Sequence, residues 1–384
     1  MAKIIQILLA AYFLLFPLGQ LFRLPLSGNF LPPAVNLYLT DVVVTLLLGL
    51  WLVWRFFFVK RPYRLPVLAK PIAVFVLVAA FSLAVNAARL TGVELLVSGL
   101  YLGRFLILAG LYLVIADLKW PGQKWLVWAG VATAVLGLGQ YFLWPDIRPL
   151  QTAGWDPHYY RVVGTLLDPG FTGLILVLTL ILLACRFEEK KKLFAILFSL
   201  VYVALALTYS RSSYLAYLVG MTVIAWVKKA PRFLLMVILA GVLTLMVLPR
   251  QSGGEGVNLQ RQSTIAARLT NWRHALEIIA DRPILGVGFN AYRYAQRDYG
   301  FLEADWQTTH AGAGADASLL FVWATTGVLG LLVYLRFWLK AVRSKNLIVT
   351  ASVTALFAHA VFLNSLFYPW VMAWLWTLLA TENS

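Results

Sequence analysis

Charged residues are scarce in this sequence of 384 residues: they make up 12% of it, whereas hydrophobic residues make up 61%. A water-soluble globular domain is about one-quarter charged, so this composition excludes an ordinary soluble fold. The mean hydropathy of +0.80 agrees with that exclusion. The composition therefore indicates a chain that is surrounded largely by lipid.

Cysteine occurs once, at Cys185, inside an apolar run. One cysteine cannot form an intrachain disulfide, so we interpret Cys185 as a small buried hydrophobic residue. The sequence also lacks a zinc-ligand spacing, a Walker phosphate loop, a dinucleotide fingerprint and a Gly-x-Ser-x-Gly elbow. It shows no cluster of carboxylates that would hold a divalent cation. We therefore predict no cofactor and no bound metal.

Acidic residues are few: there are 16 of them against 32 lysines and arginines, which gives a net charge of +16. Such a charge is common among nucleic-acid-binding proteins. Here, however, the basic residues cluster in short loops between apolar runs, where the positive-inside rule places them in membrane proteins. We therefore expect contact with membrane lipid and no nucleic acid partner.

Long apolar runs recur along the whole chain, and about 20 such residues cross roughly 30 Å of hydrocarbon. Backbone polar groups must be satisfied internally in lipid, so these runs should be helices. The sequence predicts an all-α, polytopic membrane protein, a single membrane domain over 1–384 with about twelve transmembrane helices. The predicted spans are 4–22, 38–58, 71–88, 94–116, 123–144, 168–186, 193–209, 212–227, 233–248, 317–336, 347–364 and 368–380.

Basic residues follow every second span, which predicts that both termini are cytoplasmic. Two segments on the opposite, outward side are longer than simple connectors, 145–168 and 249–316. We expect the second, a large outward loop between spans nine and ten, to be partly helical. Ser263 or Thr264 would cap a helix that continues to about Ala280. The apolar stripe of this helix should pack on the membrane domain and consists of Ile265, Leu269, Trp272, Leu276 and Ile279.

Arginines on the outward side oppose the positive-inside bias and therefore need partners. Arg211 lies in a very short connector, Arg161 in the first outward segment, and Arg268 and Arg273 on the loop helix. If they converge, their planar guanidinium groups would suit the oxygens of a pyrophosphate. For Arg211 the alternative is snorkelling to lipid headgroups, or a salt bridge.

Candidate proton acceptors lie where the large loop returns to the membrane, at Asp316 and His310. Asp316 could accept a proton from a sugar hydroxyl, or it could cap the following helix. His310 is a second candidate, with an exposed loop residue as its alternative. His359 lies within a span and is interpreted as structural. Arg104, also within a span, would pair with a carbonyl or an acid, or contact a lipid phosphate.

Four motifs occur together in one order. Thr208-Tyr209-Ser210-Arg211-Ser212 resembles a T-x-S-R-[SG] element of the O-antigen ligase and O-antigen polymerase superfamily. Before it, Arg161-Val162-Val163-Gly164-Thr165 with Asp168-Pro169 is similar to that superfamily's R-x2-G-T-F … P-N element. After it come a segment like R-x3-W-x2-A-L … P-L-x-G-x-G-x-F, at 268–289, and a closing element at 316–330. The resemblance covers about residues 155–335.

The resemblance implies a GT-C membrane glycosyltransferase of the bacterial cytoplasmic membrane, with its active site on the extracytoplasmic face. Its donor would be an undecaprenyl-pyrophosphate-linked oligosaccharide, and its acceptor a glycan or glycolipid. Ligases of the superfamily begin the last motif with histidine, whereas polymerases often have Asp-Asn there. Asp316-Ala317 therefore favours a polymerase of O-antigen or capsule repeat units, although Ala317 matches neither group. A ligase that acts on lipid A–core remains the alternative.

We expect inverting, metal-independent glycosyl transfer, with Arg161, Arg211, Arg268 and Arg273 on the pyrophosphate and Asp316 as the base. A flippase and a chain-length regulator would be possible partners in glycan assembly. Two other classes stay open, a lipid-linked glycan transporter and a non-catalytic scaffold. Against transport, the sequence shows no matching pair of broken helices and few ionisable residues at mid-membrane.

Overall fold

The computed structural model describes residues 1–25, 35–60, 62–153, 155–186, 191–304, 306, 313–343 and 346–382. These residues form α-helices, short 3-10 helices and one small antiparallel sheet, in which β1 (Arg23–Pro25) pairs with β2 (Asn36–Tyr38). The all-α prediction is confirmed.

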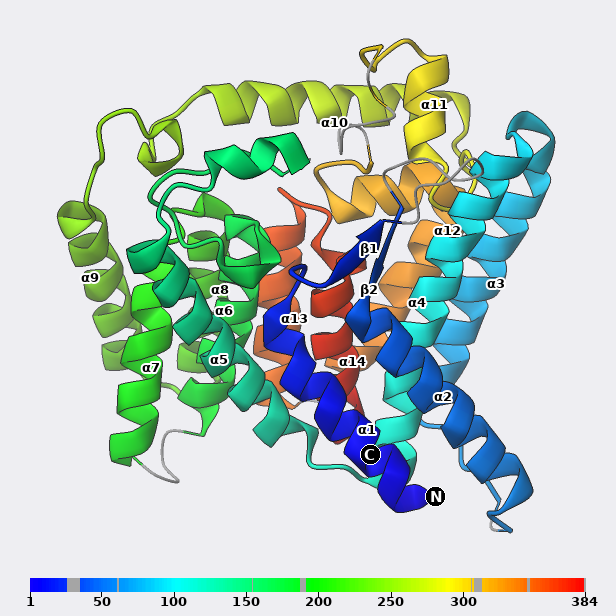
Figure 1. Ribbon diagram of the computed structural model, residues 1–384, viewed down its shortest axis with the longest axis horizontal. Coiled ribbons are helices and arrows are strands. Elements are labelled where there is room, and N and C mark those ends of the chain that lie inside the picture. The colour runs from blue at the N-terminus through cyan, green and yellow to red at the C-terminus, as the bar shows by residue number, and fades with distance from the viewer. Residues whose placement is uncertain are drawn as a thin grey trace.

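The α-helices are of two kinds, long apolar ones that make up the bundle and two that belong to the segment between α9 and α12 (Figure 1). The bundle helices are α1 (Ala2–Leu15), α2 (Leu39–Phe57), α3 (Ala69–Val85), α4 (Gly92–Leu118), α5 (Gly122–Leu143), α6 (Pro169–Cys185), α7 (Lys191–Ala206), α8 (Arg211–Val227), α9 (Pro231–Val247), α12 (Ser318–Val342), α13 (Leu347–Ala360) and α14 (Pro369–Glu382). The other two are α10 (Ser263–Asp281) and α11 (Tyr292–Asp298).

Each of the twelve predicted spans corresponds to one of the bundle helices. By length and composition, four of the helices in the described part of the chain can cross a membrane unaided, namely α2, α4, α5 and α12. Several others are apolar but shorter, at 10–17 residues. Twelve crossings therefore stay a prediction, while the membrane character of the protein is plain.

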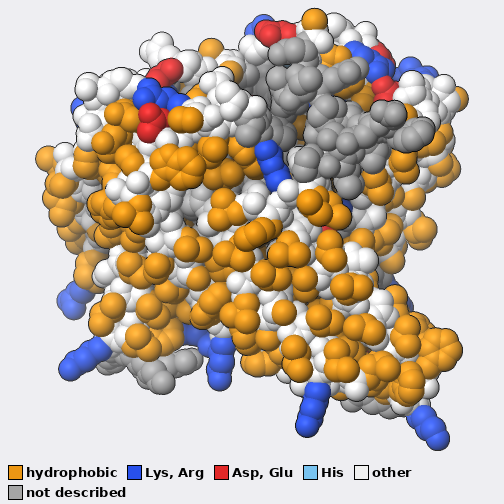
Figure 2. Space-filling view, in the orientation of Figure 1, with side chains coloured by type: hydrophobic (Ala, Val, Ile, Leu, Met, Phe, Trp, Pro, Cys, Tyr) orange, Lys and Arg blue, Asp and Glu red, His pale blue; other side chains and the backbone are white. Residues whose placement is uncertain are grey.

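The two ends of the bundle differ (Figure 1). Both termini lie at one end, and α10 runs across the other end, nearly perpendicular to the bundle helices. On the face shown in Figure 2, lysines and arginines project from the end that holds the termini, and a broad apolar band covers the middle. The end covered by α10 carries the segment that we predicted to face outward.

Helix α6 is buried inside the bundle over almost its whole length. Asp168 precedes it and caps it: the carboxylate Oδ1 accepts hydrogen bonds from the backbone N–H groups of Gly170 at 2.7 Å and Phe171 at 2.8 Å. An aspartate at this position satisfies amides that have no partner within the helix. The cap fixes Asp168 at the N-terminal end of α6.

Helix α12 is broken at Gly327, where φ is +66° and ψ is −173°. The loop after α10 packs into this break: Val287 N–H donates to the Ala324 carbonyl at 2.9 Å, and Val328 N–H donates to the Pro283 carbonyl at 2.8 Å. A side chain on residue 327 would lie only 1.9 Å from the Ile284 carbonyl oxygen, so glycine is required there. The Gly286-Val287-Gly288 stretch thus holds the loop on α12.

The predicted loop helix forms, as α10, but its predicted buried stripe is wrong. Ile265, Leu269 and Leu276 are 48%, 55% and 50% exposed. The buried residues are Ala275, Ile278 and Ile279, so Ile279 is the one residue of the stripe that is fully buried. Periodicity defines an apolar face but not the part of it that another helix covers, and α10 meets the bundle through its C-terminal half. The residue before the helix is Gln262, and neither Ser263 nor Thr264 caps it.

Candidate functional site

Arg161 joins the first outward segment to the connector between α7 and α8. Its Nε donates to the Thr208 carbonyl at 2.9 Å and its Nη2 to the Tyr209 carbonyl at 3.3 Å. The residue is only 6% exposed, and burial together with the charge of Arg261 lowers the pKa of Arg161 to about 9. It remains a cation at neutral pH, and Arg261 and Arg211 act on it electrostatically.

Arg211 is the first residue of α8 and reaches the large segment that precedes α10. Its Nη1 donates to the carbonyls of Leu259 at 3.2 Å and Arg261 at 3.1 Å. Its Nη2 is buried and has no hydrogen-bond partner. Among the described residues Arg211 forms no salt bridge, so that alternative does not hold there. One strong donor is left over for a ligand.

Arg268 lies on α10 and interacts electrostatically with Asp316, in the turn before α12. That turn is held against α10, because the Asp316 N–H donates to Asn271 Oδ1 at 2.7 Å. The guanidinium carbon of Arg268 also lies 5.7 Å from the centre of the Phe362 ring. Helix α12 begins at Ser318 after Ala317, with no side-chain cap, so the alternative role of Asp316 as a helix cap is wrong.

The acidity of Asp316 reflects opposing influences. Burial raises the pKa of Asp316, the Arg268 cation lowers it, and the carboxylates of Asp156 and Asp168 raise it further. The balance is a pKa above the ordinary value for aspartate. A carboxylate shifted in this direction is a better proton acceptor once it is ionised.

A pocket of about 290 Å³ opens between α8, α10 and the end of α13. Arg211 and Arg268 both line it, and most of its other walls are apolar: Leu215, Ile265, Leu269, Trp272 and Phe362, with Ser212 beside them. Two exposed apolar residues of α10, Ile265 and Leu269, therefore belong to the wall of a pocket. A ligand with an anionic head and a hydrocarbon tail matches two guanidinium groups at an apolar wall.

The sequence did not identify Arg261 as a further arginine that acts on Arg211 and Arg268. Arg261 interacts electrostatically with both Arg211 and Arg268, and burial lowers its pKa. Its own side chain is tied to the loop, with Nη1 donating to the Gly256 carbonyl at 2.9 Å and Nε to Thr264 Oγ1 at 3.1 Å. Nothing in the sequence distinguished Arg261 from the other loop arginines, because its place depends on how the loop folds back.

One predicted site residue, Arg273, is not brought into this group by the structure. Arg273 is exposed on α10, and it does not appear among the groups that act on Arg268 or Asp316. Five residues on an α-helix correspond to a turn of about 500°, so Arg273 points roughly 140° away from Arg268. His310 lies outside the described residues.

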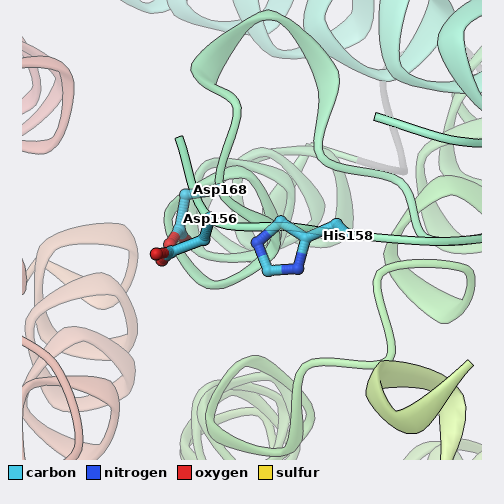
Figure 3. A group of neighbouring side chains, drawn as sticks. All are labelled: Asp156, His158 and Asp168. Carbon is cyan, nitrogen blue, oxygen red and sulfur yellow. The ribbon is translucent and has the colours of Figure 1, made fainter. Parts of the chain in front are cut away.

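A cluster of acid and histidine side chains lies beside these arginines (Figure 3). One ligand atom from each of Asp156, His158 and Asp168 can be chosen so that all lie within 4.8 Å of one another, and the imidazole points toward the two carboxylates. The expectation that no carboxylate cluster exists is therefore wrong. The sequence hid it because Asp156 and Asp168 belong to a segment whose fold could not be read from periodicity.

The donor set of this cluster, one imidazole and two carboxylates, fits a divalent cation. His158 Nε2 is buried without a hydrogen-bond partner, and burial together with Arg161 and Arg261 lowers the pKa of His158 to about 3. The imidazole is thus neutral, as a metal ligand must be. The same two arginines create a positive field that opposes a cation there. The negative charges of Asp156 and Asp168 in this cluster also raise the pKa of Asp316.

His359 and Arg104 are both engaged within the protein. His359 bridges α8 and the segment after α13: its Nε2 lies 3.3 Å from Ser212 Oγ and 3.2 Å from Ser213 Oγ, and its Nδ1 lies 2.7 Å from Ser365 Oγ. Arg104 Nη2 donates to Asp41 Oδ2 at 2.7 Å and to the Asn36 carbonyl. The contacts of His359 thus join α8 to the segment after α13, which agrees with the structural role expected for it. Arg104 pairs with an acid and a carbonyl, which was one of its two expected roles.

The protein is thus a helical membrane protein with arginines, carboxylates and an amphipathic pocket gathered at one end of its bundle. Residues 193–335 match the family model described as O-antigen ligase. The match runs from α7 into α12 and contains Arg211, Arg261, Arg268 and Asp316, while Arg161 and Asp168 precede it. It confirms the resemblance to the O-antigen ligase and polymerase superfamily. A search of curated proteins found no match.

Proposed function

We propose that this protein is a membrane glycosyltransferase that polymerises lipid-linked repeat units of a surface polysaccharide. The observation that carries the proposal is the pocket lined by Arg211 and Arg268, with Asp316 interacting electrostatically with Arg268. Cations, an apolar wall and a proton acceptor at one site are what transfer from a polyprenyl-pyrophosphate glycan requires. The O-antigen ligase match over 193–335 supports this reaction class.

In the proposed reaction, a hydroxyl oxygen of the acceptor attacks the anomeric carbon of the donor sugar. The bond between that carbon and the pyrophosphate oxygen breaks, so undecaprenyl pyrophosphate leaves with the bonding electron pair. Asp316 takes the proton of the attacking hydroxyl. The configuration at the anomeric carbon is inverted, because the attack comes from the side opposite the leaving group.

The arginines offset the negative charge that grows on the leaving pyrophosphate. Arg211 has a buried Nη2 without a partner, and Arg268 faces the same pocket, so these two would contact the phosphate oxygens. Arg161 instead donates hydrogen bonds to two backbone carbonyls. Arg161 and Arg261 would act as positioning residues that add positive charge. The apolar wall at Leu269 and Trp272 would receive the first isoprene units.

The preference for a polymerase rests on the residue at the start of the last motif. A ligase of the superfamily has histidine there, and this chain has Asp316 followed by Ala317. A carboxylate flanked by Arg268 can act as the base without a histidine. Transfer to lipid A–core is the alternative outcome of the same chemistry, since it changes only the acceptor.

The test uses the purified full chain, reconstituted in vesicles with an undecaprenyl-pyrophosphate-linked repeat unit. A ladder of longer lipid-linked glycans supports a polymerase. Transfer that occurs only when lipid A–core is added supports a ligase. If the glycan crosses the bilayer without any new glycosidic bond, the protein is a transporter and the proposal fails.

A further inference from the structure

A second pocket, of about 670 Å³, lies between α2 and α4. Its walls are mostly apolar and come from both helices, and its polar residues include Asn36, Asp41 and Arg104. It shares no residue with the pocket formed by Arg211 and Arg268. Figure 1 places α2 and α4 on the opposite side of the bundle from α8 and α9.

The face of α4 toward this pocket has unfilled space along its length. Gly92, Gly99 and Gly103 line the pocket, and a Cβ added to any of them would meet no atom within 4 Å. Leu96 and Leu100, on the same face, are 51% and 43% exposed. A flexible hydrocarbon chain would fit along such a groove and cover these leucines.

Arg104 supplies a polar end to this groove. Its Nη2 makes both of its hydrogen bonds, and among the described residues the Nε and Nη1 groups have no acceptor. Its guanidinium carbon lies 5.1 Å from the Tyr38 ring centre and 5.4 Å from that of Tyr101, which hold the group in place. The unused donors are therefore available to the oxygens of a phosphate.

The groove connects to the candidate site through a chain of contacts. Tyr38, beside Arg104, donates its hydroxyl to Gln20 Oε1 at 3.1 Å, and Gln20 Nε2 donates to the Tyr368 hydroxyl at 3.1 Å. The Tyr368 ring stacks on Phe171, with centres 3.8 Å apart. The Phe171 N–H donates to Asp168.

Helix α11, from the segment that we place on the outer side, lies over the outer end of the same groove. Arg297 pairs with Glu94 in the first turn of α4, and Arg293 interacts electrostatically with Tyr101. The groove therefore opens at the same end of the bundle as Asp316. Both pockets are amphipathic, and arginines are among the polar residues that line each of them.

We propose that the groove between α2 and α4 binds the phosphate-bearing isoprenoid lipid of the acceptor, with its phosphate on Arg104. This inference rests on the proposed function, because it assigns the second substrate of the same reaction. The donor would occupy the pocket at Arg211 and Arg268, and the acceptor would extend its sugar toward Asp316 from the other side.

The test is photolabelling of the purified full chain by a diazirine-bearing isoprenyl phosphate, with the labelled peptides mapped by mass spectrometry. Gly99→Leu places a bulky side chain in the groove. Gly139→Leu is the matched control, because Gly139 lies on α5, outside the groove, and a Cβ added there also meets no atom within 4 Å. Excluding about two methylene groups of chain from the groove should weaken labelling of α2 and α4 about tenfold. Both variants should keep the melting temperature of the wild type.

The proposal is supported if Gly99→Leu loses this labelling, Gly139→Leu keeps it, and unlabelled isoprenyl phosphate competes better than isoprenol or phosphatidylglycerol. It is overturned if α2 and α4 are not labelled, if Gly99→Leu labels like wild type, or if phosphatidylglycerol competes equally. The readout is independent of catalysis. Labelling without transferase activity would therefore overturn the proposed function but not the lipid site. Transferase activity without labelling would overturn the lipid site but not the proposed function.

Discussion

Arg268 on α10 and Asp316 before α12 act on each other electrostatically, although they are 48 positions apart in the sequence and lie on separate elements. Asn271, less than one turn after Arg268, accepts the Asp316 N–H at 2.7 Å and keeps the two elements together. A proton acceptor is thereby held against α10, and it interacts electrostatically with Arg268, which lines an amphipathic pocket.

Replacing Asp316 by asparagine should remove the proton acceptor while keeping the size of the side chain. We expect Asp316→Asn to lower the rate of glycan elongation by about 10²–10⁴-fold, the usual contribution of a general base. The measurement is the initial rate in reconstituted vesicles at equal protein. Glu277→Gln, an exposed carboxylate on α10, is the control and should elongate at the wild-type rate. A full-length ladder from Asp316→Asn would rule out this residue as the base.

The pH dependence of elongation follows from the raised pKa of Asp316. The carboxyl must be ionised to accept a proton, so activity should fall as the pH is lowered through a pKa that is higher than the ordinary aspartate value. Arg268 opposes that rise, so Arg268→Gln should move the acid limb of kcat/KM to higher pH. An acid limb that stays in place in Arg268→Gln would show that another group controls it.

Arg211 should contribute through charge at the donor phosphate. We expect Arg211→Ala to reduce kcat by about 10²–10³-fold, the effect of removing one charge-stabilising donor. Because Arg211 also holds the carbonyls of Leu259 and Arg261, Arg211→Lys tests the charge in a side chain of similar length. Arg211→Lys should recover part of the rate.

Arg273→Ala is the matched control for Arg211→Ala, since Arg273 is exposed on α10. It should change the rate less than about threefold, as expected of a surface substitution. If Arg273→Ala proved as damaging as Arg211→Ala, the donor would have to bind on the other face of α10.

Gly327 should be intolerant of any side chain. Its φ of +66° with ψ of −173° is a conformation that only glycine adopts readily, and a Cβ would lie 1.9 Å from the Ile284 carbonyl oxygen. Gly327→Ala should destabilise the protein by about 3–5 kcal/mol through strain and overlap. Gly300→Ala is the control, with φ of +71° and open space around its Cβ, and should cost about 1–2 kcal/mol. Thermal unfolding in detergent compares them, and equal losses would contradict the packing role.

Metal removal tests the acid and histidine cluster. We expect the elongation rate to be unchanged after chelation with EDTA and after addition of Mg²⁺, Mn²⁺ or Zn²⁺, because arginines at the pocket can offset the phosphate charge. If chelation abolishes elongation, zinc restores it, and His158→Ala removes the zinc response, then Asp156, His158 and Asp168 hold a required metal.

The helices could be predicted because their signal is local. Apolar runs of the right length and glycine or proline between them define α1 to α9 and α12 to α14 without knowledge of their neighbours. The rotation of α10 could not be predicted in the same way. Its stripe at Ile265, Leu269 and Leu276 has helical spacing, and what covers that stripe depends on the tilt of α10 over the bundle.

The site was predictable to the extent that it follows recognisable motifs. Arg211, Arg268 and Asp316 stood out because they are charged groups at the ends of apolar segments or within familiar patterns. Arg261 and the cluster of Asp156, His158 and Asp168 did not, because loop folding brings them together and no periodicity describes it.

In the proposed reaction Arg211 and Arg268 hold a diphosphate, which leaves as Asp316 accepts a proton. The most direct measurement is the number of undecaprenyl pyrophosphate molecules released per glycosidic bond formed by the reconstituted protein. We predict a ratio of one for the wild type, and no release from Asp316→Asn although donor is still bound. Movement of the lipid-linked glycan with no pyrophosphate released, or equal release from Asp316→Asn, would contradict the account.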